Sequence, residues 1–258
     1  MHGGAHAALG RARKRKPAYG RAMSLTKFGH TLARRGVARE TGRCYSWGME
    51  NSATDIDALA CMRGLQSSGT IACATRGMDG APRVRFLSGL HFELDAVYLL
   101  ASRGMPFARQ LMRDDRIQLL SEARPGVSVR LTGHAVPVPE EEQVRWRLVI
   151  FDERPRYRDL YPAFKHDDSL VFVVRDGFFE WLDLVSEPIL RVYVPFGNGR
   201  VVPSGYRIGE TCTRCGTCLS SCPQHSIVSG NPFRIVQEHC LQCGACVKTC
   251  PRQAIVAV

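Results

Sequence analysis

The chain has 258 residues, 45% of them hydrophobic, and a formal net charge of +11. This length suits one large domain or two smaller ones, and no run of about 20 apolar residues indicates a transmembrane helix. The positive charge is concentrated in residues 1–48, which hold eleven Lys and Arg against one acidic residue. The rest of the chain is close to neutral, so it is not expected to present a basic surface to nucleic acid or anionic lipid.

Residues 1–50 are rich in Gly, Ala and Arg and have no sustained apolar period. We predict a basic, disordered extension. Such a tail can contact RNA, DNA or anionic lipid, and any nucleic-acid binding is expected only through it.

From Asp55 the pattern becomes that of an amphipathic helix, which ends near Ser68-Gly69. Two further helices are predicted, from Pro106 to about Arg113 and from Pro139 to about Phe151, each with proline at its start. Short apolar or alternating runs separated by turn residues predict strands. These runs are 70–75, 83–90, 97–101, 117–120, 127–136, 170–174 and 178–184. A mainly β segment with intervening helices predicts a small antiparallel barrel.

This order resembles the FMN-binding split barrel of the pyridoxamine 5'-phosphate oxidase-like superfamily, which includes flavin reductases and nitroimidazole-reductase-type proteins. The resemblance covers about residues 55–185, and it implies a flavin-binding domain over residues 51–186. The segments that carry it are 82–87 (PRVRFL), 97–102 (VYLLAS), 108–111 (ARQL), 115–117 (DRI), 129–135 (VRLTGHA), 161–162 (YP) and 179–184 (FEWLDL).

Two arginines on one strand could bind the flavin phosphate. Side chains two apart in a strand share a face, so Arg83 and Arg85 point the same way, and guanidinium groups bind phosphate with paired hydrogen bonds. The alternative is that both arginines line a solvated face. The helix beginning at Pro106 presents free N–H groups next to Ser102 and Arg103.

The resemblance extends the predicted cofactor site and implies a homodimer with the flavin between two subunits. The full set of predicted cofactor-binding residues is Arg83, Arg85, Phe86, Ala101, Ser102, Arg103, Gln110 and Arg130. Phe107 departs from the family, which often has a phosphate-contacting lysine there. Arg103 or Arg109 could supply the charge, or the site could bind FMN weakly, or hold a deazaflavin or haem. No catalytic side chain is predicted, and His91, His134 and His166 are each expected to be a structural or surface histidine.

Residues 187–208 contain several Pro and Gly and predict a connector that includes one strand. After it, the pattern C-x2-C-x2-C-x3-C-P occurs twice, 28 residues apart. The eight cysteines are Cys212, Cys215, Cys218, Cys222, Cys240, Cys243, Cys246 and Cys250.

This spacing predicts two [4Fe-4S] clusters, because three thiolates in each run turn inward around one cluster and the fourth ligates the other. One set is then Cys212, Cys215, Cys218 and Cys250, and the other is Cys240, Cys243, Cys246 and Cys222. Structural zinc and a disulfide framework fit this pattern less well. About residues 205–258 resemble the bacterial two-cluster ferredoxins, which implies a small α+β domain over residues 209–258. The remaining cysteines, Cys44, Cys61 and Cys73, are expected to be free buried thiols.

Together these features predict an iron–sulfur flavoprotein oxidoreductase that passes electrons between two clusters and FMN and reduces a small organic acceptor. The alternatives are a non-catalytic electron carrier or redox sensor with the barrel as a dimerisation scaffold, and a nucleic-acid-binding regulator that uses the basic tail. A redox partner protein is a further expected partner. Oxygen-sensitive clusters and the lack of an export signal favour the cytoplasm.

Overall fold

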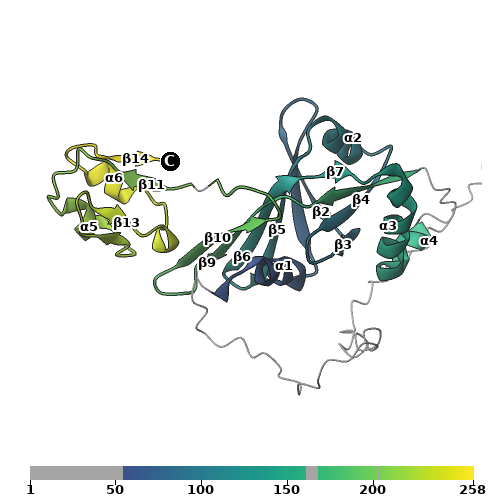
Figure 1. Cartoon of the computed structure of the whole chain (residues 1–258), viewed down its shortest axis with the longest axis horizontal. Coiled ribbons are helices and arrows are strands. Elements are labelled where there is room, and N and C mark those ends of the chain that lie inside the picture. Colours follow the sequence, from purple (N-terminus) through teal and green to yellow (C-terminus); the bar gives the residue numbers. More distant parts are fainter. Residues whose placement is uncertain (1–54, 161–167, 203) are drawn as a thin grey trace, which may run out of the picture. The chain divides into compact units, whose positions relative to one another are not determined.

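The computed structural model describes residues 55–160, 168–202 and 204–258. The predicted basic extension, Cys44 and His166 lie outside the described residues. Figure 1 shows the arrangement of the helices and strands. Within the described ranges, no helix is both long enough and apolar enough to cross a membrane.

The first part of the structure contains two antiparallel sheets. The larger sheet has six strands in the order β10-β9-β6-β5-β1-β2, and the smaller has four in the order β3-β4-β8-β7. The strands of the larger sheet are β1 (Ile71–Arg76), β2 (Pro82–Leu87), β5 (Arg116–Arg124), β6 (Val127–His134), β9 (Gly177–Asp183) and β10 (Leu190–Phe196). Those of the smaller sheet are β3 (Leu90–Phe92), β4 (Val97–Ser102), β7 (Val136–Pro137) and β8 (Ser169–Val174).

Each run of residues predicted to be a strand overlaps one or two of these strands, although β5 extends beyond the predicted 117–120 at both ends. The run 127–136 forms β6 and the short strand β7, which belong to different sheets. Gly133, near the end of β6, allows a close approach there, because a Cβ atom at this position would lie 2.6 Å from the carbonyl oxygen of Asp176.

The three predicted helices are present as α1 (Ala58–Ser67), α2 (Pro106–Arg113) and α3 (Glu140–Glu153). Asp57 caps α1 by accepting a hydrogen bond from the amide of Ala60 at 2.7 Å. A short helix that the sequence did not indicate, α4 (Pro155–Leu160), follows α3 directly. The helix α1 packs mainly on β5 and β6, whereas α3 packs on the four-stranded sheet, as Figure 1 shows.

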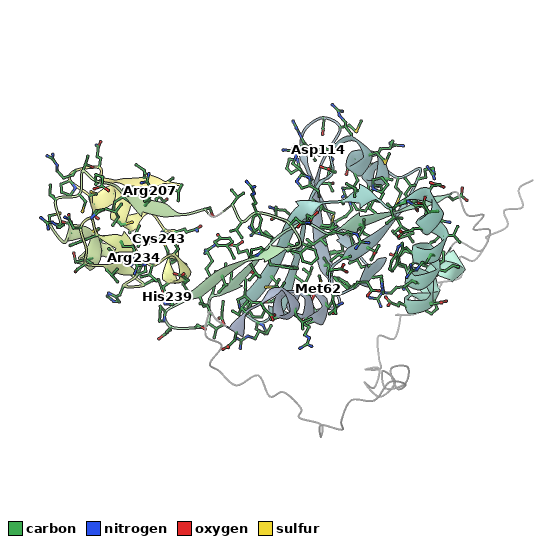
Figure 2. All side chains as sticks on the ribbon, viewed as in Figure 1. Met62, Asp114, Arg207, Arg234, His239 and Cys243 are labelled. Carbon is green, nitrogen blue, oxygen red and sulfur yellow. The ribbon has the colours of Figure 1, made fainter. Side chains whose placement is uncertain are left out.

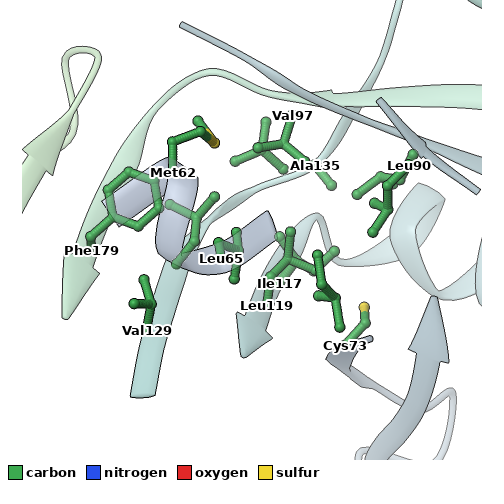
Figure 3. Close-up of a cluster of buried hydrophobic side chains, with 14 of the residues drawn as sticks. Met62, Leu65, Cys73, Leu90, Val97, Ile117, Leu119, Val129, Ala135 and Phe179 are labelled. Carbon is green, nitrogen blue, oxygen red and sulfur yellow. The ribbon is translucent and has the colours of Figure 1, made fainter. Parts of the chain in front are cut away.

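The main core lies between the two sheets and α1. Leu65, Leu119 and Phe179 are completely buried there and come from α1, β5 and β9 (Figure 3). A second, smaller core lies under α3, where the rings of Tyr98 and Trp146 stack with their centres 3.8 Å apart. Burial of large apolar side chains by both layers stabilises the arrangement of the sheets.

The C-terminal part contains an internal repeat. The short helices α5 (Thr217–Ser221) and α6 (Ala245–Thr249) each begin just after a glycine, Gly216 and Gly244, in the left-handed conformation. The strand pairs are β11 (Tyr206–Ile208) with β14 (Ile255–Ala257), and β12 (Ile227–Val228) with β13 (Arg234–Ile235); a 3₁₀ helix, η2 (Gln237–His239), precedes the second cysteine run.

The predicted fold class is confirmed: a mainly β part with flanking helices, arranged as in a split barrel, precedes a small α+β domain. The predicted connector, residues 187–208, contains β10, which is part of the six-stranded sheet along β9. The domain boundaries themselves stay predictions.

Candidate functional site

The eight predicted ligand cysteines line two cavities in the C-terminal domain. Each cavity is lined by three cysteines of one run and the last cysteine of the other run. The first cavity has Cys212, Cys215, Cys218 and Cys250, and the second has Cys222, Cys240, Cys243 and Cys246. These are the two ligand sets expected from the spacing.

Backbone N–H groups point at several of these sulfur atoms. The amides of Ser226 and Gln242 lie 3.4 Å from the sulfurs of Cys222 and Cys240, and that of Ala254 lies 3.3 Å from the sulfur of Cys250. Four thiolates around a small cavity, with N–H groups donating to sulfur, fit an iron–sulfur cluster.

Ser226, which the sequence did not indicate as a site residue, lies beside the sulfur of a predicted cluster ligand. Its hydroxyl oxygen lies 3.2 Å from the sulfur of Cys222, and it is buried. The equivalent residue of the second repeat is Ala254, which can offer only its amide. Because the first repeat has serine where the second has alanine, it gains a side-chain hydrogen bond to one sulfur. An alignment of the two repeats would have pointed to Ser226 from the sequence alone.

In the barrel, Arg83 and Arg85 lie on the same face of β2. They stand opposite Thr75 and Cys73 of β1, whose side chains are buried, whereas the intervening Val84 is 72% exposed on the other face. Arg83 is exposed and pairs with Asp79 at 2.7 Å. Hydrogen bonds from the Ala81 amide and Arg83, together with the Arg83 charge, hold the pKa of Asp79 below its usual range.

Arg85 is held by neutral partners. It donates to the hydroxyl of Thr75 at 2.8 Å and to the side-chain oxygen of Gln110 at 2.7 Å. Thr75 in turn donates to Gln110 at 2.8 Å, so the three side chains form one network. The guanidinium group also lies 4.5 Å from the centre of the Phe107 ring. A partly buried guanidinium held by a hydroxyl, an amide and a ring keeps its positive charge available for an anion.

The thiol of Cys73 lies beside this network. Burial raises its pKa to about 12, although the charge of Arg85 and a hydrogen bond from it act in the opposite direction. Cys73, which is paired with Arg85 across the two strands, is therefore a neutral thiol and adds no second charge to the network.

The start of α2 is close to Arg85, because Phe107 is the second residue of that helix. The N-cap residue of α2, Met105, makes no capping hydrogen bond with its side chain. Its first N–H groups and the positive end of the helix dipole therefore add to the positive potential of Arg85. Ala101 and Ser102 end β4, just before this helix, and the Arg103 amide donates to the carbonyl of Asp168 at 2.8 Å. Of the two arginines considered as substitutes for a lysine at position 107, Arg109 donates to the carbonyl of Gly104 at 3.1 Å.

Two predicted residues lie away from this group, on the outer face of the six-stranded sheet. Phe86 is 77% exposed there, and Arg130 pairs with Glu180 at 2.9 Å. The strand pairings place Phe86, Leu120 and Arg130 in one row across β2, β5 and β6, with Ala72 of β1 between the first two. The structure thus brings Arg83, Arg85 and Gln110 together and separates them from Phe86 and Arg130.

A cavity of about 710 Å³ lies at one end of the six-stranded sheet. Its polar lining includes Arg76, Arg116, His134 and Arg200, and its apolar lining includes Phe178. Asp114, labelled in Figure 2, lies near this cavity. It pairs with Arg116 and Arg76, and hydrogen bonds from Arg116 lower the pKa of Asp114 to about 2. Among the described residues that line the cavity, none belongs to the predicted flavin set. Thr75 lines it and also binds Arg85, so the cavity and the Arg85 network share one residue.

The two described histidines expected to be structural are bonded to carboxylates. His91 is buried and lies 2.9 Å from Glu93 and 2.8 Å from Glu153. His134 lies 2.7 Å from Asp115.

Comparisons with known proteins identify part of the chain. Residues 204–251 match the family described as the 4Fe-4S dicluster domain. With eight cysteines around two cavities, this match supports two [4Fe-4S] clusters in the C-terminal domain. No curated protein matches the chain.

Several solved structures are similar to about half of the chain. A NimC/NimA family protein from Clostridium acetobutylicum is 16% identical, with a TM-score of 0.42 over 51% of this chain and 89% of its own. A protein from the same organism, related to general stress protein 26 of Bacillus subtilis and assigned to the pyridoxinephosphate oxidase family, is 14% identical, with a TM-score of 0.42 over 54% of this chain and 95% of its own. A heme binding protein from Mycobacterium smegmatis is 18% identical, with a TM-score of 0.42 over 57% and 60%. The likeness is one of fold alone.

Proposed function

We propose that the chain is an iron–sulfur flavoprotein oxidoreductase that passes electrons from two [4Fe-4S] clusters to FMN and so reduces a small organic acceptor, in the manner of a flavin reductase or nitroreductase. The observation that carries the proposal is the pair of four-cysteine cavities in a chain whose barrel also holds Arg85. Among the described residues, the partners of its guanidinium group are Thr75, Gln110 and Phe107, all neutral. When bound, the clusters supply one-electron transfer and FMN supplies one- or two-electron transfer.

Residues of the chain itself would hold the clusters. The eight cysteines ligate them, and the amides of Ser226, Gln242 and Ala254 and the hydroxyl of Ser226 donate to sulfur. Such hydrogen bonds stabilise negative charge on the sulfurs and thereby favour the reduced state.

In the barrel, the phosphate of FMN would bind between Arg85 and the N-terminus of α2. Arg85 is positioned by Thr75 and Gln110 and is stacked on Phe107. Arg83 would contribute once it leaves Asp79, an exposed pair that costs little to break. This arrangement supplies positive charge without the lysine that the resembling family has at position 107.

A second copy of the chain would cover the outer face of the six-stranded sheet. Val84 is 72% exposed, Phe86 77% and Leu120 39%, and all three lie on this face. Large apolar side chains at adjacent positions favour burial in a homodimer. The 710 Å³ cavity has the size of a small-molecule site, and its apolar wall at Phe178 suits an aromatic acceptor.

Anaerobic purification followed by cofactor analysis tests the proposal. We expect about eight iron and eight sulfide per chain and about one FMN. Clusters without any flavin, also after incubation with excess FMN, would contradict the flavoprotein and favour the electron carrier. A deazaflavin or haem in the extract would replace FMN in the proposal. Removal of residues 1–48 should leave both cofactors in place.

A further inference from the structure

The two cluster cavities differ in charge at equivalent positions of the repeat. Arg214 of the first run aligns with Gln242 of the second, and Arg252 after the second run aligns with Gln224 after the first. Because the last cysteine of each run serves the other cavity, both arginines line the first cavity and both glutamines line the second. Among the described residues that line the second cavity, none has a charged side chain apart from its cysteines.

The backbone is the same in both repeats at one of these positions. Arg214 and Gln242 have φ values of 60° and 58°, and both precede a cysteine. Gly216 and Gly244, with φ values of 84° and 74°, follow the same pattern. The exchange between arginine and glutamine is therefore a change of side chain on an equivalent backbone.

The glutamines of the second cavity bind other parts of the chain. Gln224 accepts a hydrogen bond from the amide of Ile189, just before β10, at 3.1 Å. Gln242 donates to the carbonyl of Ser204 at 2.6 Å. His239, in the 3₁₀ helix just before Cys240, adds a contact of 2.9 Å to the carbonyl of Ile189. The two glutamines at the second cavity are thus engaged in hydrogen bonds with residues 189 and 204 of the same chain.

The arginines of the first cavity remain available. Arg214 and Arg252 are both exposed, and neither forms an ion pair with any described residue. Cys215 of this cavity is exposed, and so is its equivalent in the second cavity, Cys243, so the two cavities differ in their arginines and not in the exposure of this cysteine. Glu210 is the charged residue that lies nearest to Arg214 in the sequence. Residues 204–258 as a whole contain five Lys and Arg and two Glu. Arg214 and Arg252 therefore place two positive side chains at the first cavity, where the second cavity has two neutral glutamines.

We propose that the first cavity, lined by Arg214 and Arg252, is the port at which an acidic redox protein docks and delivers electrons, whereas the second cavity serves transfer within the chain. The inference rests on the proposed function only for the step in which electrons pass on from the clusters to FMN. At each event the partner is oxidised by one electron and the iron–sulfur group bound by Cys212, Cys215, Cys218 and Cys250 is reduced by one. No bond forms and no proton moves. Carboxylates on the partner would pair with the two guanidinium groups and speed the encounter.

The test uses the full cluster-loaded chain and a flavodoxin, a small acidic flavin protein, as the probe. In the double variant Arg214→Gln/Arg252→Gln, the first cavity takes the residues found at the second. The matched control, Arg207→Gln/Arg234→Gln, removes the same charge from the same domain at residues that line neither cavity (Figure 2). Iron and sulfide content is measured first, so that a loss of clusters is recognised.

Two readouts are compared between the variants: the affinity for oxidised flavodoxin by calorimetry, which involves no turnover, and the rate of cluster reduction by flavodoxin hydroquinone in stopped flow. We expect the port variant to lose about 10-fold in both at low salt, with a weaker dependence on salt than the wild type. The control should change both by less than about 3-fold. Equal losses in both variants, no loss in either, or no binding by the wild type would overturn the proposal. If the purified protein contained no FMN but the two variants still differed as expected, the flavoprotein proposal would be contradicted and the docking proposal would still be supported.

Discussion

The guanidinium group of Arg85 lies 4.5 Å from the centre of the Phe107 ring, and Phe107 is buried in the first turn of α2. The ring thus occupies the position where the resembling family often has a lysine, and it supports a positive charge supplied from β2. A cation above an aromatic face is stabilised, so the Phe107 ring helps to hold the guanidinium group of Arg85 in place.

Substitution of Arg85 should therefore remove flavin but not iron. Arg85→Gln loses a charged hydrogen-bond donor that is worth about 1.5–3 kcal/mol, so FMN affinity should fall about 10- to 100-fold. Anaerobic fluorescence titration with FMN measures this, and iron and sulfide content should stay unchanged. Arg63→Gln, on the exposed side of α1, is the control and should bind FMN as the wild type does. Equal FMN affinity in both variants would remove Arg85 from the proposed site.

Glu180 on β9 is expected to be a critical residue for stability. It is 6% exposed and pairs with both Arg191 of β10 and Arg130 of β6. Glu180→Gln leaves the buried guanidinium of Arg191 without its carboxylate, which should cost about 3–5 kcal/mol and lower Tm by about 6–20 °C.

Circular dichroism of the cluster-loaded chain measures this change, with the exposed Glu210→Gln as the control. The double variant Glu180→Gln/Arg191→Leu should recover part of the loss, because no uncompensated charge remains at Arg191. A melting temperature in Glu180→Gln equal to that of the control would show that the pair is not needed.

Acid should destabilise the barrel through Asp183. Although burial opposes it, hydrogen bonds from the amides of Val185 and Ser186, together with the charge of Arg124, hold the pKa of Asp183 below its usual range. A carboxyl group with a depressed folded-state pKa stabilises the fold above the unfolded pKa of about 3.9, and this contribution is lost as the pH falls through the folded-state value.

Asp183→Asn should accordingly be less stable than the wild type at pH 6, by about 1–3 kcal/mol, and the difference should shrink below about pH 4. Urea unfolding followed by the fluorescence of Trp181, which is buried two residues away, reports on this region. A difference between the two proteins that is constant from pH 6 to pH 3 would assign the effect to packing and not to the charge.

The thiols of Cys61 and Cys73 should not react in the folded protein. Both are fully buried, and burial, the largest cause for each, raises their pKa to about 12. At pH 8 only about one such thiol in ten thousand is ionised, and the thiolate is the reactive form. Mass spectrometry after iodoacetamide treatment should find both unmodified until urea is added. Rapid modification of Cys73 in the native state would indicate that the region around Arg85 opens.

The parts of the fold and site that the sequence predicted are those fixed by local rules. The cysteine spacing predicted which four cysteines share a cavity, and in the structure the trailing cysteine of each run lines the cavity of the other run. Proline predicted where two helices start, because it fixes φ and needs no hydrogen-bond donor: Pro106 is the first residue of α2, and Pro139 is the N-cap residue just before α3. The shared face of Arg83 and Arg85 followed from the alternation of side chains in a strand.

The rest depends on pairing between distant strands, which local patterns do not specify. Thr75 and Gln110 are 35 residues apart, and only the packing of α2 near β1 brings them to Arg85. Arg130 was predicted for the cofactor site, but the register of β6 and β9 places it opposite Glu180. The repeat itself shows arginine at position 214 and glutamine at position 242. Only the structure shows that Gln242 is bonded to the carbonyl of Ser204.

Freeze-quench EPR of the reduced protein mixed with a nitroaromatic acceptor tests the central claim most directly. The account predicts that the cluster signal of the wild type decays at the rate of acceptor reduction, and that the signal of flavin-depleted Arg85→Gln persists over the same time. Equally fast decay of the cluster signal in the two proteins would contradict electron transfer through a flavin in the barrel.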